Sequence, residues 1–319
     1  MNKEAENGGL HWAVEAVRVR KRLGGRPVLT DVDLQVPIGS VYGLLGANGA
    51  GKTTLLRLCM GWYRPDAGEV RVLGEPMIAE AARLRQRIVY VGEDGNALAH
   101  FTVAEAFQYA SHLYENWDAS RAERLLRGLE LPPKRRLARL SVGMRLQVKF
   151  AMALSARPSV LLLDEPTNGL DPVVRHQFLQ LLSQEAAGGV TLVLATHNLA
   201  DIERMIDHAA FMYKGRIVRA AELEELRQQV RQVRAVLSEP LPSPLPPRLD
   251  ACVWHIEQTG RWYVLTVERE TDALVDFLRS LGAEVVDVEA LDLEALFRLI
   301  MLREGYARDG LVLSESAGL

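Results

Sequence analysis

Apolar and polar residues alternate in two early segments of the chain, and this period of two predicts β-strands. The alternation runs from Trp12 to Arg20 and again from Val28 to Val36, as in strands that bury one face. We expect these two segments to pair as antiparallel strands. A turn and a short strand, Glu69–Leu73, follow the segment 41–60, so a small antiparallel β-layer is expected beside that segment.

Continuous apolar runs in the middle of the chain predict a second kind of strand. Uninterrupted apolar strands separated by helical segments indicate a parallel sheet that is covered on both faces. One helix is expected from Thr102, which forms a capping box with Glu105. The expected strands are residues 41–45, 88–91, 160–163 and 190–195, the other expected helices are 55–60, 122–129 and those that begin at Ser141 and Pro172, and a hairpin is expected over 210–219.

Five prolines between Ser238 and Arg248 interrupt the pattern in the last third of the chain. Because proline cannot continue a helix or a central strand, we expect an extended linker over 238–248. The rest of this region predicts a small α+β domain. Its expected strands are 230–237, 251–256, 262–267 and 284–288, and its expected helices are 273–281 and 291–302. We therefore expect two domains, residues 1–226 and 227–319.

The composition is that of an ordinary globular protein. Of 319 residues, 48% are hydrophobic and 25% are charged, which allows a sizeable core in each of two domains. The net charge of −3 gives no support to nucleic-acid binding. Cys59 and Cys252 lie far apart without a C-x-x-C motif, so neither a disulfide framework nor a zinc site is expected. We expect no signal peptide and no segment that spans a bilayer.

A glycine-rich segment lies between the apolar run 41–45 and the expected helix 55–60, and it fits the phosphate-binding pattern G-x-x-x-x-G-K-[ST]. Its glycines let the backbone curl around a polyphosphate, so that amide groups and the positive end of the helix face anionic oxygens. Lys52 would reach the β- and γ-phosphates, and the Thr53 hydroxyl would ligate Mg²⁺. The strand before it and the helix after it disfavour a chance glycine-rich turn. The expected nucleotide-binding residues are Gly46, Ala47, Asn48, Gly49, Ala50, Gly51, Lys52, Thr53 and Thr54.

Two consecutive carboxylates follow the apolar run 160–163. Asp164 and Glu165 would lie at the carboxyl edge of the sheet, where open α/β folds bind their ligands. Asp164 would help to hold Mg²⁺, and Glu165 would orient and deprotonate an attacking water. His197 follows the next apolar run and could touch the γ-phosphate or the water. Without a phosphate loop, such an acidic pair would more often be a helix start, and a lone histidine would more often be structural.

Further motifs give the chain a resemblance to a known family. Residues 140–145 (Leu-Ser-Val-Gly-Met-Arg) are similar to the signature Leu-Ser-Gly-Gly-Gln of ABC transporters, residues 168–171 (Asn-Gly-Leu-Asp) to their D-loop, and residues 195–197 to their switch histidine. Residues 12–226 therefore resemble the nucleotide-binding subunit of an ABC transporter. The resemblance implies two chains that meet head to tail, with a shared nucleotide site. In that site Ser141 and the amide of Gly143 cap the γ-phosphate held by the partner's Lys52, and Val142 and Asp171 also lie at the nucleotide.

Three positions depart from the family pattern. Val142 replaces the first glycine of the signature, which keeps an amide donor but adds a β-branched side chain. Glu93 stands where the family usually has a glutamine after the strand 88–91, and it could still ligate Mg²⁺ or water. Leu23 stands where an aromatic residue normally stacks on adenine. We therefore expect weaker stacking and looser selectivity for the base, unless Trp12 or Tyr42 substitutes.

The resemblance also implies a fold and a function. The expected fold class is α/β, a P-loop NTPase core with an antiparallel β-layer and a helical subdomain, followed by the small α+β C-terminal domain. We expect an ATPase that uses ATP and Mg²⁺ and acts as a homodimer, bound to separate transmembrane permease subunits on the cytoplasmic face of the membrane, without nucleic acid. Residues 288–297 resemble the C-terminal region of single-cassette bacterial exporters, so export is the expected direction.

Two other functions remain open on the sequence. A regulatory subunit that binds nucleotide with little turnover would fit the departures at Leu23, Glu93 and Val142, although the intact Asp164 and Glu165 argue against it. A family member that acts in translation or DNA repair would be expected to carry two cassettes or a long coiled coil, and neither pattern is found in this sequence.

Overall fold

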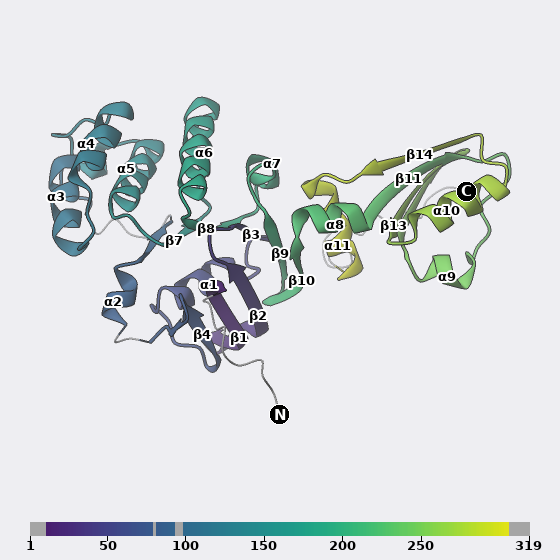
Figure 1. Ribbon diagram of the computed structural model, residues 1–319, viewed down its shortest axis with the longest axis horizontal. Helices are drawn as coiled ribbons and strands as arrows, with labels where there is room; N and C mark the ends of the chain where they lie inside the picture. Colours follow the sequence, from purple (N-terminus) through teal and green to yellow (C-terminus); the bar gives the residue numbers. More distant parts are fainter. Residues whose placement is uncertain (1–10, 79–80, 93–97, 306–319) are drawn as a thin grey trace, which may run out of the picture. The chain divides into compact units, whose positions relative to one another are not determined.

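The structure is a computed structural model of the chain, and it describes residues 11–78, 81–92 and 98–305 (Figure 1). The chain divides into two compact units between Ala220 and Ala221. The expected boundary after residue 226 falls inside helix α8 (Leu223–Gln229), which packs against the first strand of the second unit. The boundary therefore lies before this helix, because the helix and the strand on which it packs belong to one unit. Within the described ranges, no helix is long and apolar enough to cross a membrane.

The predicted antiparallel β-layer consists of β1 (Trp12–Leu23), β2 (Arg26–Pro37), β4 (Ala67–Val72) and β5 (Glu75–Pro76). The strand order is β2-β1-β4-β5. Strands β1 and β2 are antiparallel, with Val14 opposite Val36 and Ala16 opposite Leu34. All four of these side chains are buried, so the alternation in the sequence correctly predicted which face of the layer is covered.

The continuous apolar runs form a six-stranded sheet. Its strands, in spatial order, are β10 (Arg216–Glu222), β9 (His208–Tyr213), β3 (Val41–Gly46), β8 (Thr191–Thr196), β7 (Val160–Asp164) and β6 (Ile88–Val91). The neighbouring pairs from β9 to β6 are parallel, as expected of buried strands that are joined by crossovers. Strand β10 follows a turn at Lys214 and Gly215, whose φ values of 45° and 78° suit the type I′ turn of a hairpin.

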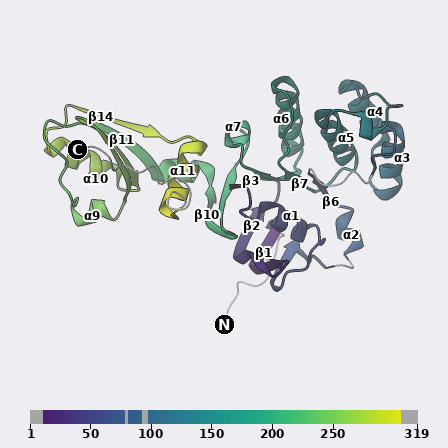
Figure 2. The ribbon, with the colours of Figure 1, turned by 180° about the vertical axis from the view of Figure 1, so that it is seen from behind.

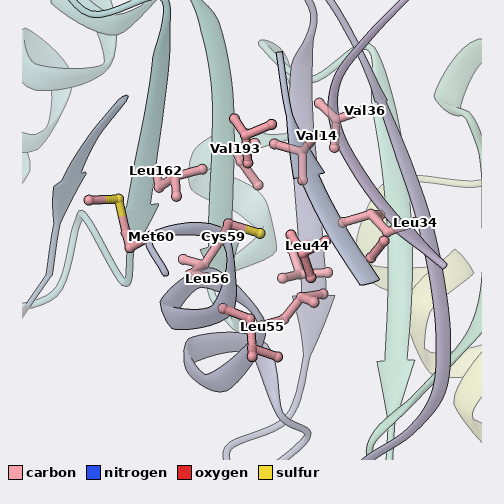
Figure 3. Close-up of a cluster of buried hydrophobic side chains, with 14 of the residues drawn as sticks. Val14, Leu34, Val36, Leu44, Leu55, Leu56, Cys59, Met60, Leu162 and Val193 are labelled. Carbon is pink, nitrogen blue, oxygen red and sulfur yellow. The ribbon is translucent and has the colours of Figure 1, made fainter. Parts of the chain in front are cut away.

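Helix α1 (Lys52–Cys59) lies between the two sheets and supplies the centre of the core. Its residues Leu55, Leu56 and Cys59 are at most 1% exposed. Figure 3 shows these side chains near Val193 of the parallel sheet and Leu34 of the antiparallel sheet. Burial raises the pKa of the Cys59 thiol to about 12, so this cysteine is an apolar packing residue at neutral pH. The phosphate loop that precedes α1 is thus attached to the most buried helix of the first unit.

The other face of the six-stranded sheet is covered by α5 (Val142–Ser155) and α6 (Pro172–Ala187). Phe150 of α5 and Phe178 of α6 are buried, and their ring centroids lie 4.3 Å apart. Both helices begin where the sequence predicts, α5 after its N-cap Ser141 and α6 with Pro172 as its first residue.

A helical subdomain is formed by α3 (Val103–Leu113), α4 (Ala119–Gly128) and α5, which have their own cluster of buried apolar side chains. Figure 2 shows the three helices side by side. The predicted capping box begins α3, because the Thr102 hydroxyl accepts from the Glu105 N–H at 3.2 Å and Glu105 Oε2 accepts from the Thr102 N–H at 2.7 Å. Short helices elsewhere in the first unit are α2 (Ala82–Arg85), the 3₁₀ helix η1 (Leu137–Arg139) and α7 (Leu199–Ile202).

The second unit contains a four-stranded antiparallel sheet. Its elements in chain order are β11 (Val230–Val236), α9 (Pro247–Asp250), β12 (Val253–Thr259), β13 (Trp262–Glu268), α10 (Thr271–Ser280), β14 (Val285–Ala290) and α11 (Leu293–Arg303). The strand order is β12-β13-β11-β14. From β11 to β14 this is the βαββαβ arrangement of ferredoxin-like folds, so the predicted α+β character of this region is confirmed.

The proline-rich segment 238–248, expected as an extended linker, lies inside the second unit and packs against it. It connects β11 to α9 inside the second unit, and its Leu245 is buried in that unit's core. The Leu241 N–H donates to the Tyr263 hydroxyl at 3.2 Å. The prolines only indicated irregular backbone. Strand β11, which precedes the proline-rich segment, belongs to the second unit because it pairs with β13 and β14.

We expect the first unit to fold without the second. All residues of the core around α1 lie before Glu222, so a chain that ends at Glu222 should unfold cooperatively on heating and bind ATP as the full chain does. Calorimetry and a nucleotide-binding titration on the two proteins test this. A truncated chain that is unfolded, or that has lost ATP binding, would show that the two units share one core.

Candidate active site

The ends of three neighbouring parallel strands bring the predicted site residues together. Asp164 of β7 lies opposite Ala195 of β8, and Ala195 in turn lies opposite Leu44 of β3. The phosphate loop after β3, Glu165 after β7 and His197 after β8 therefore leave the sheet at the same level. This is the edge at which open α/β sheets bind their ligands.

The phosphate loop, residues 46–51, follows a tight curve that requires its glycines. A Cβ on Gly46 would lie 2.7 Å from the Met212 carbonyl oxygen, and one on Gly51 would lie 2.7 Å from a methyl carbon of β2. Gly51 also has a φ of 109°, which favours glycine. The Gly215 N–H donates to the Ala50 carbonyl oxygen at 3.0 Å. The turn between β9 and β10 thus holds the loop in place.

The start of α1 presents unpaired backbone donors and a buried lysine. Gly51 is the N-cap, and no side chain caps this helix end, so the amide groups of the first turn can bind an anion. Lys52 is 5% exposed. Its Nζ donates to the carbonyl oxygens of Gly46 at 2.7 Å and Ala47 at 3.3 Å. A phosphate oxygen is a stronger acceptor than a peptide carbonyl, so it would attract the ammonium group away from these carbonyls.

Asp164 is a buried carboxylate with one oxygen unpaired. Its Oδ2 accepts from the Tyr90 hydroxyl at 3.0 Å, whereas its Oδ1 is buried and has no hydrogen-bond partner among the described residues. Burial raises the pKa of Asp164, against the effect of hydrogen bonds from the Thr53 and Tyr90 hydroxyls. An unpaired buried oxygen next to a hydroxyl is a suitable donor pair for a hard cation, which takes oxygen ligands.

Glu165 lies beside Asp164 in a polar, charged environment. Its carboxylate accepts hydrogen bonds from Thr196 Oγ1 and His197 Nδ1, each at 2.9 Å, and Oε1 lies 3.4 Å from Lys52 Nζ. Burial by itself raises the pKa of Glu165, but the two hydrogen bonds and the positive charge of Lys52 outweigh it, so the pKa is below its ordinary value. The structure thus brings together Lys52, Glu165 and His197, as the sequence predicted.

Tyr90 and Thr196 are site residues that the sequence reasoning missed. Tyr90 lies on β6 opposite Leu162, two residues before Asp164, and Thr196 ends β8. Both residues carry a hydroxyl near the end of a strand next to β7, and this feature could have identified them. It can be recognised only when the pairing of the strands is known.

The signature residues and the D-loop lie next to each other at the starts of two helices. Ser141 caps α5 by accepting from the Met144 N–H at 3.1 Å, and Asp171 caps α6 by accepting from the amides of residues 173 and 174. Val142 is 58% exposed. Its Cγ1 lies 3.1 Å from the position of a Cβ on Gly169, and the Gly169 carbonyl oxygen lies 3.5 Å from the position of a Cβ on Gly143. The start of α5 therefore lies beside the D-loop.

Glu93 and Leu23 are the remaining residues that the sequence predicts at the nucleotide or the metal. Glu93 lies outside the described residues. Leu23 is half-buried at the end of β1, where it pairs with Arg26. Val28, two residues beyond Arg26, has its carbonyl oxygen 3.2 Å from the position of a Cβ on Gly51. Leu23 is therefore at the end of a hairpin that reaches the phosphate loop.

Comparison with known proteins agrees with this geometry. The sequence matches the family model described as ABC transporter over residues 29–168. The ABC transporter ATP-binding protein YtrB of Bacillus subtilis (strain 168) is 30% identical over 285 residues, which are 89% of this chain and 96% of YtrB. A Nod factor export ATP-binding protein I of Burkholderia orbicola (strain AU 1054) is 35% identical over 249 residues, which are 76% of this chain and 82% of that protein.

A solved structure extends the comparison to three dimensions. It is a dimeric ATP-binding cassette bound to ADP and Pi, with 25% sequence identity and a TM-score of 0.60, and the match covers 66% of this chain and 98% of the solved chain. The match of 285 residues to YtrB is longer than the first unit, which ends at Ala220, so that similarity reaches into the second unit. The chain therefore belongs to the ABC transporter family, as an ATP-binding subunit with ATPase activity.

Proposed function

We propose that this subunit powers export through separate membrane-spanning permease subunits, as a homodimer on the cytoplasmic face of the membrane. The observation that carries the catalytic part is the position of the Glu165 carboxylate, 3.4 Å from Lys52 Nζ and 2.9 Å from His197 Nδ1. A carboxylate between a phosphate-binding lysine and a histidine at the same strand edge is suited to accept a proton from water next to the γ-phosphate.

The proposed reaction is in-line attack of water on the γ-phosphorus. A bond forms from the water oxygen to phosphorus while the bond from phosphorus to the bridging oxygen breaks, and ADP leaves. Glu165 accepts the proton of the water. His197 and Thr196 hold the Glu165 carboxylate by their hydrogen bonds. Lys52 and the amides at the start of α1 balance the charge on the phosphate oxygens.

The same site suits Mg²⁺, through Asp164 and Thr53. The unpaired Asp164 Oδ1 is the observation that supports this. Among the described residues, no group of three or more His, Cys, Asp or Glu side chains is placed to hold a metal ion, so phosphate oxygens would complete the ligand set, as is usual for Mg²⁺. When bound, Mg²⁺ would neutralise charge on the phosphates. Glu93 is also proposed as a ligand, from the sequence alone.

The proposed dimer adds the start of α5 of each chain to the nucleotide of the other. The positive end of this helix and the amide of Gly143 would face the γ-phosphate, with Ser141 and Val142 beside it and Asp171 at the adjoining helix start. The exposed position of Val142 on α5 is consistent with a surface that meets another chain. The similarity to a dimeric cassette bound to ADP and Pi supports the dimer itself.

Export is proposed from the relatives. The Burkholderia relative is named as a Nod factor export protein, and the similarity to YtrB reaches into the second unit. We propose that the second unit, a domain with its own core, assists dimerisation and takes no part in the chemistry.

A regulatory subunit with little turnover is the second candidate. Val142 and Leu23 favour it, because each changes a family position at the nucleotide. The contacts of Glu165 with Lys52, Thr196 and His197 favour an active enzyme instead. Steady-state ATPase measurement on the subunit assembled with its membrane partner decides between the two, since the regulatory subunit would show little hydrolysis there.

Glu165→Gln should abolish most turnover without loss of binding. Glutamine keeps the size and hydrogen bonding of the side chain but cannot accept a proton, so kcat should fall roughly 10²- to 10⁴-fold. ATP should still bind, and gel filtration should give a dimer with MgATP. Glu123→Gln, at an exposed position of α4, is the control. Turnover that Glu165→Gln leaves unchanged would remove Glu165 from the mechanism.

Lys52→Ala should lose the nucleotide. The substitution removes the side-chain cation that directly follows the phosphate loop, so ATP binding by titration and the ATP-dependent dimer should both disappear. Lys134→Ala, at an exposed lysine in the same unit, should change neither. Full ATP affinity in Lys52→Ala would contradict the proposed role of the loop lysine.

Leu23→Tyr should increase the preference for ATP over GTP. An aromatic ring at this position could stack on adenine, which is worth about 1 kcal/mol, whereas Leu23 offers no aromatic face. Competition binding on the wild type, Leu23→Tyr and Leu23→Ala checks this. Strong adenine preference that is the same in all three proteins would show that another residue contacts the base.

A further inference from the structure

Tyr90 is held against Asp164 by its surroundings on three sides. Its hydroxyl donates to Asp164 Oδ2 at 3.0 Å. Its ring meets the ring of Trp62 edge to face, with centroids 4.9 Å apart. A Cβ on Gly92 would lie 2.3 Å from the Tyr90 hydroxyl oxygen and 2.6 Å from Cζ. Tyr90 can therefore take this position only because residue 92 has no side chain.

The backbone at Gly92 is itself fixed. Lys149 Nζ of α5 donates to the Gly92 carbonyl oxygen at 2.7 Å. Trp62, Tyr90, Gly92 and Lys149 also line a cavity of about 300 Å³, and Asp164 is not part of its lining. Removal of the hydroxyl alone would leave the ring and its contact with Trp62 in place.

The hydrogen bond from Tyr90 decides how the Asp164 carboxylate is turned. A carboxylate with one oxygen fixed by a donor cannot rotate freely about its last torsion, so the direction of the second oxygen is fixed as well. That second oxygen is Oδ1, the buried atom without a hydrogen-bond partner among the described residues. Outer hydrogen-bond partners of metal ligands commonly set ligand orientation in this way.

We propose that Tyr90 is a positioning residue that turns Asp164 Oδ1 toward the bound divalent cation, and that Trp62 and Gly92 hold Tyr90 in this role. The inference rests on the proposed function of Asp164 as a metal ligand. It adds Tyr90, Gly92 and Trp62 to the residues on which metal binding depends. Of these, Trp62 is 51% exposed.

The test measures the affinity for Mn²⁺, a spectroscopic substitute for Mg²⁺. Electron paramagnetic resonance titrations use the full chain with ATP present and with Glu165→Gln to prevent turnover. In this background Tyr90→Phe should raise the Kd for Mn²⁺ roughly tenfold. ATP binding measured in EDTA should not change, because the phosphate loop is not altered. Gly92→Ala should give a similar loss, since its methyl group displaces the Tyr90 hydroxyl.

The contribution of Trp62 to Mn²⁺ binding is tested with and without the Tyr90 hydroxyl. Trp62→Ala should raise the Kd for Mn²⁺ less than Tyr90→Phe does, and it should have no further effect when it is combined with Tyr90→Phe. Trp62→Phe, which keeps an aromatic ring against Tyr90, is the matched control and should leave the Kd unchanged. An equal loss from Trp62→Ala with and without the Tyr90 hydroxyl would contradict an action through Tyr90.

Asp164→Asn distinguishes a failure of the Tyr90 proposal from a failure of the proposed metal-binding role of Asp164. If Asp164→Asn weakens Mn²⁺ binding and Tyr90→Phe does not, Tyr90 has no positioning role. If Asp164→Asn itself leaves the Kd unchanged, the proposed function of Asp164 is wrong. A Tyr90→Phe chain that also loses ATP binding in EDTA would show a general structural defect, which likewise overturns the positioning role.

Discussion

The parallel register of β3, β8 and β7 is the constraint on which the site depends. Leu44, Ala195 and Asp164 lie opposite one another across the three strands, and Leu45 of β3 lies opposite Thr196 of β8 in the next row. Because side chains on a strand alternate between faces, a slip of one residue would exchange the faces of Asp164 and its neighbours. The register is fixed by the buried residues of both faces, with α1 packed on one of them. The core around α1 and the position of the site carboxylates are thus set by the same contacts.

Glu165 has a backbone conformation that separates it from the strand it follows. Its φ of 49° is unfavourable for a residue with a side chain, at a cost of about 1–3 kcal/mol. The Glu165 N–H still donates to the Ala195 carbonyl oxygen at 2.8 Å, and Thr196 and His197 bind its carboxylate. In an extended strand, adjacent side chains point to opposite faces. The turn at Glu165 lets two consecutive carboxylates lie at one edge in different environments, with the pKa of Asp164 raised and that of Glu165 lowered.

Local patterns predicted most of the first unit, because its signals are local. The strands β3 and β7, the phosphate loop, and the caps at Thr102 and Ser141 each depend on residues that are close in sequence. The contact of Tyr90 with Asp164 could not be predicted in this way, since it depends on the pairing of β6 with β7. The packing of the proline-rich segment could not be predicted for a related reason. Prolines report the local backbone, whereas the division into units depends on which strand β11 pairs with.

The position of Val142 suggests what the change from the family glycine does. Its amide remains at the start of α5, so the donor toward a phosphate is kept. Its side chain is 58% exposed, and its Cγ1 lies 3.1 Å from where a Cβ on Gly169 would be. Gly169 follows Glu165 closely, and the Asn168 N–H donates to the Glu165 carbonyl oxygen at 3.2 Å. In the proposed dimer, α5 faces the nucleotide of the other chain while Glu165 acts on its own. The Val142 side chain therefore lies at the helix start that serves one site, beside the loop that follows the base of the other, and a glycine would place no side chain there.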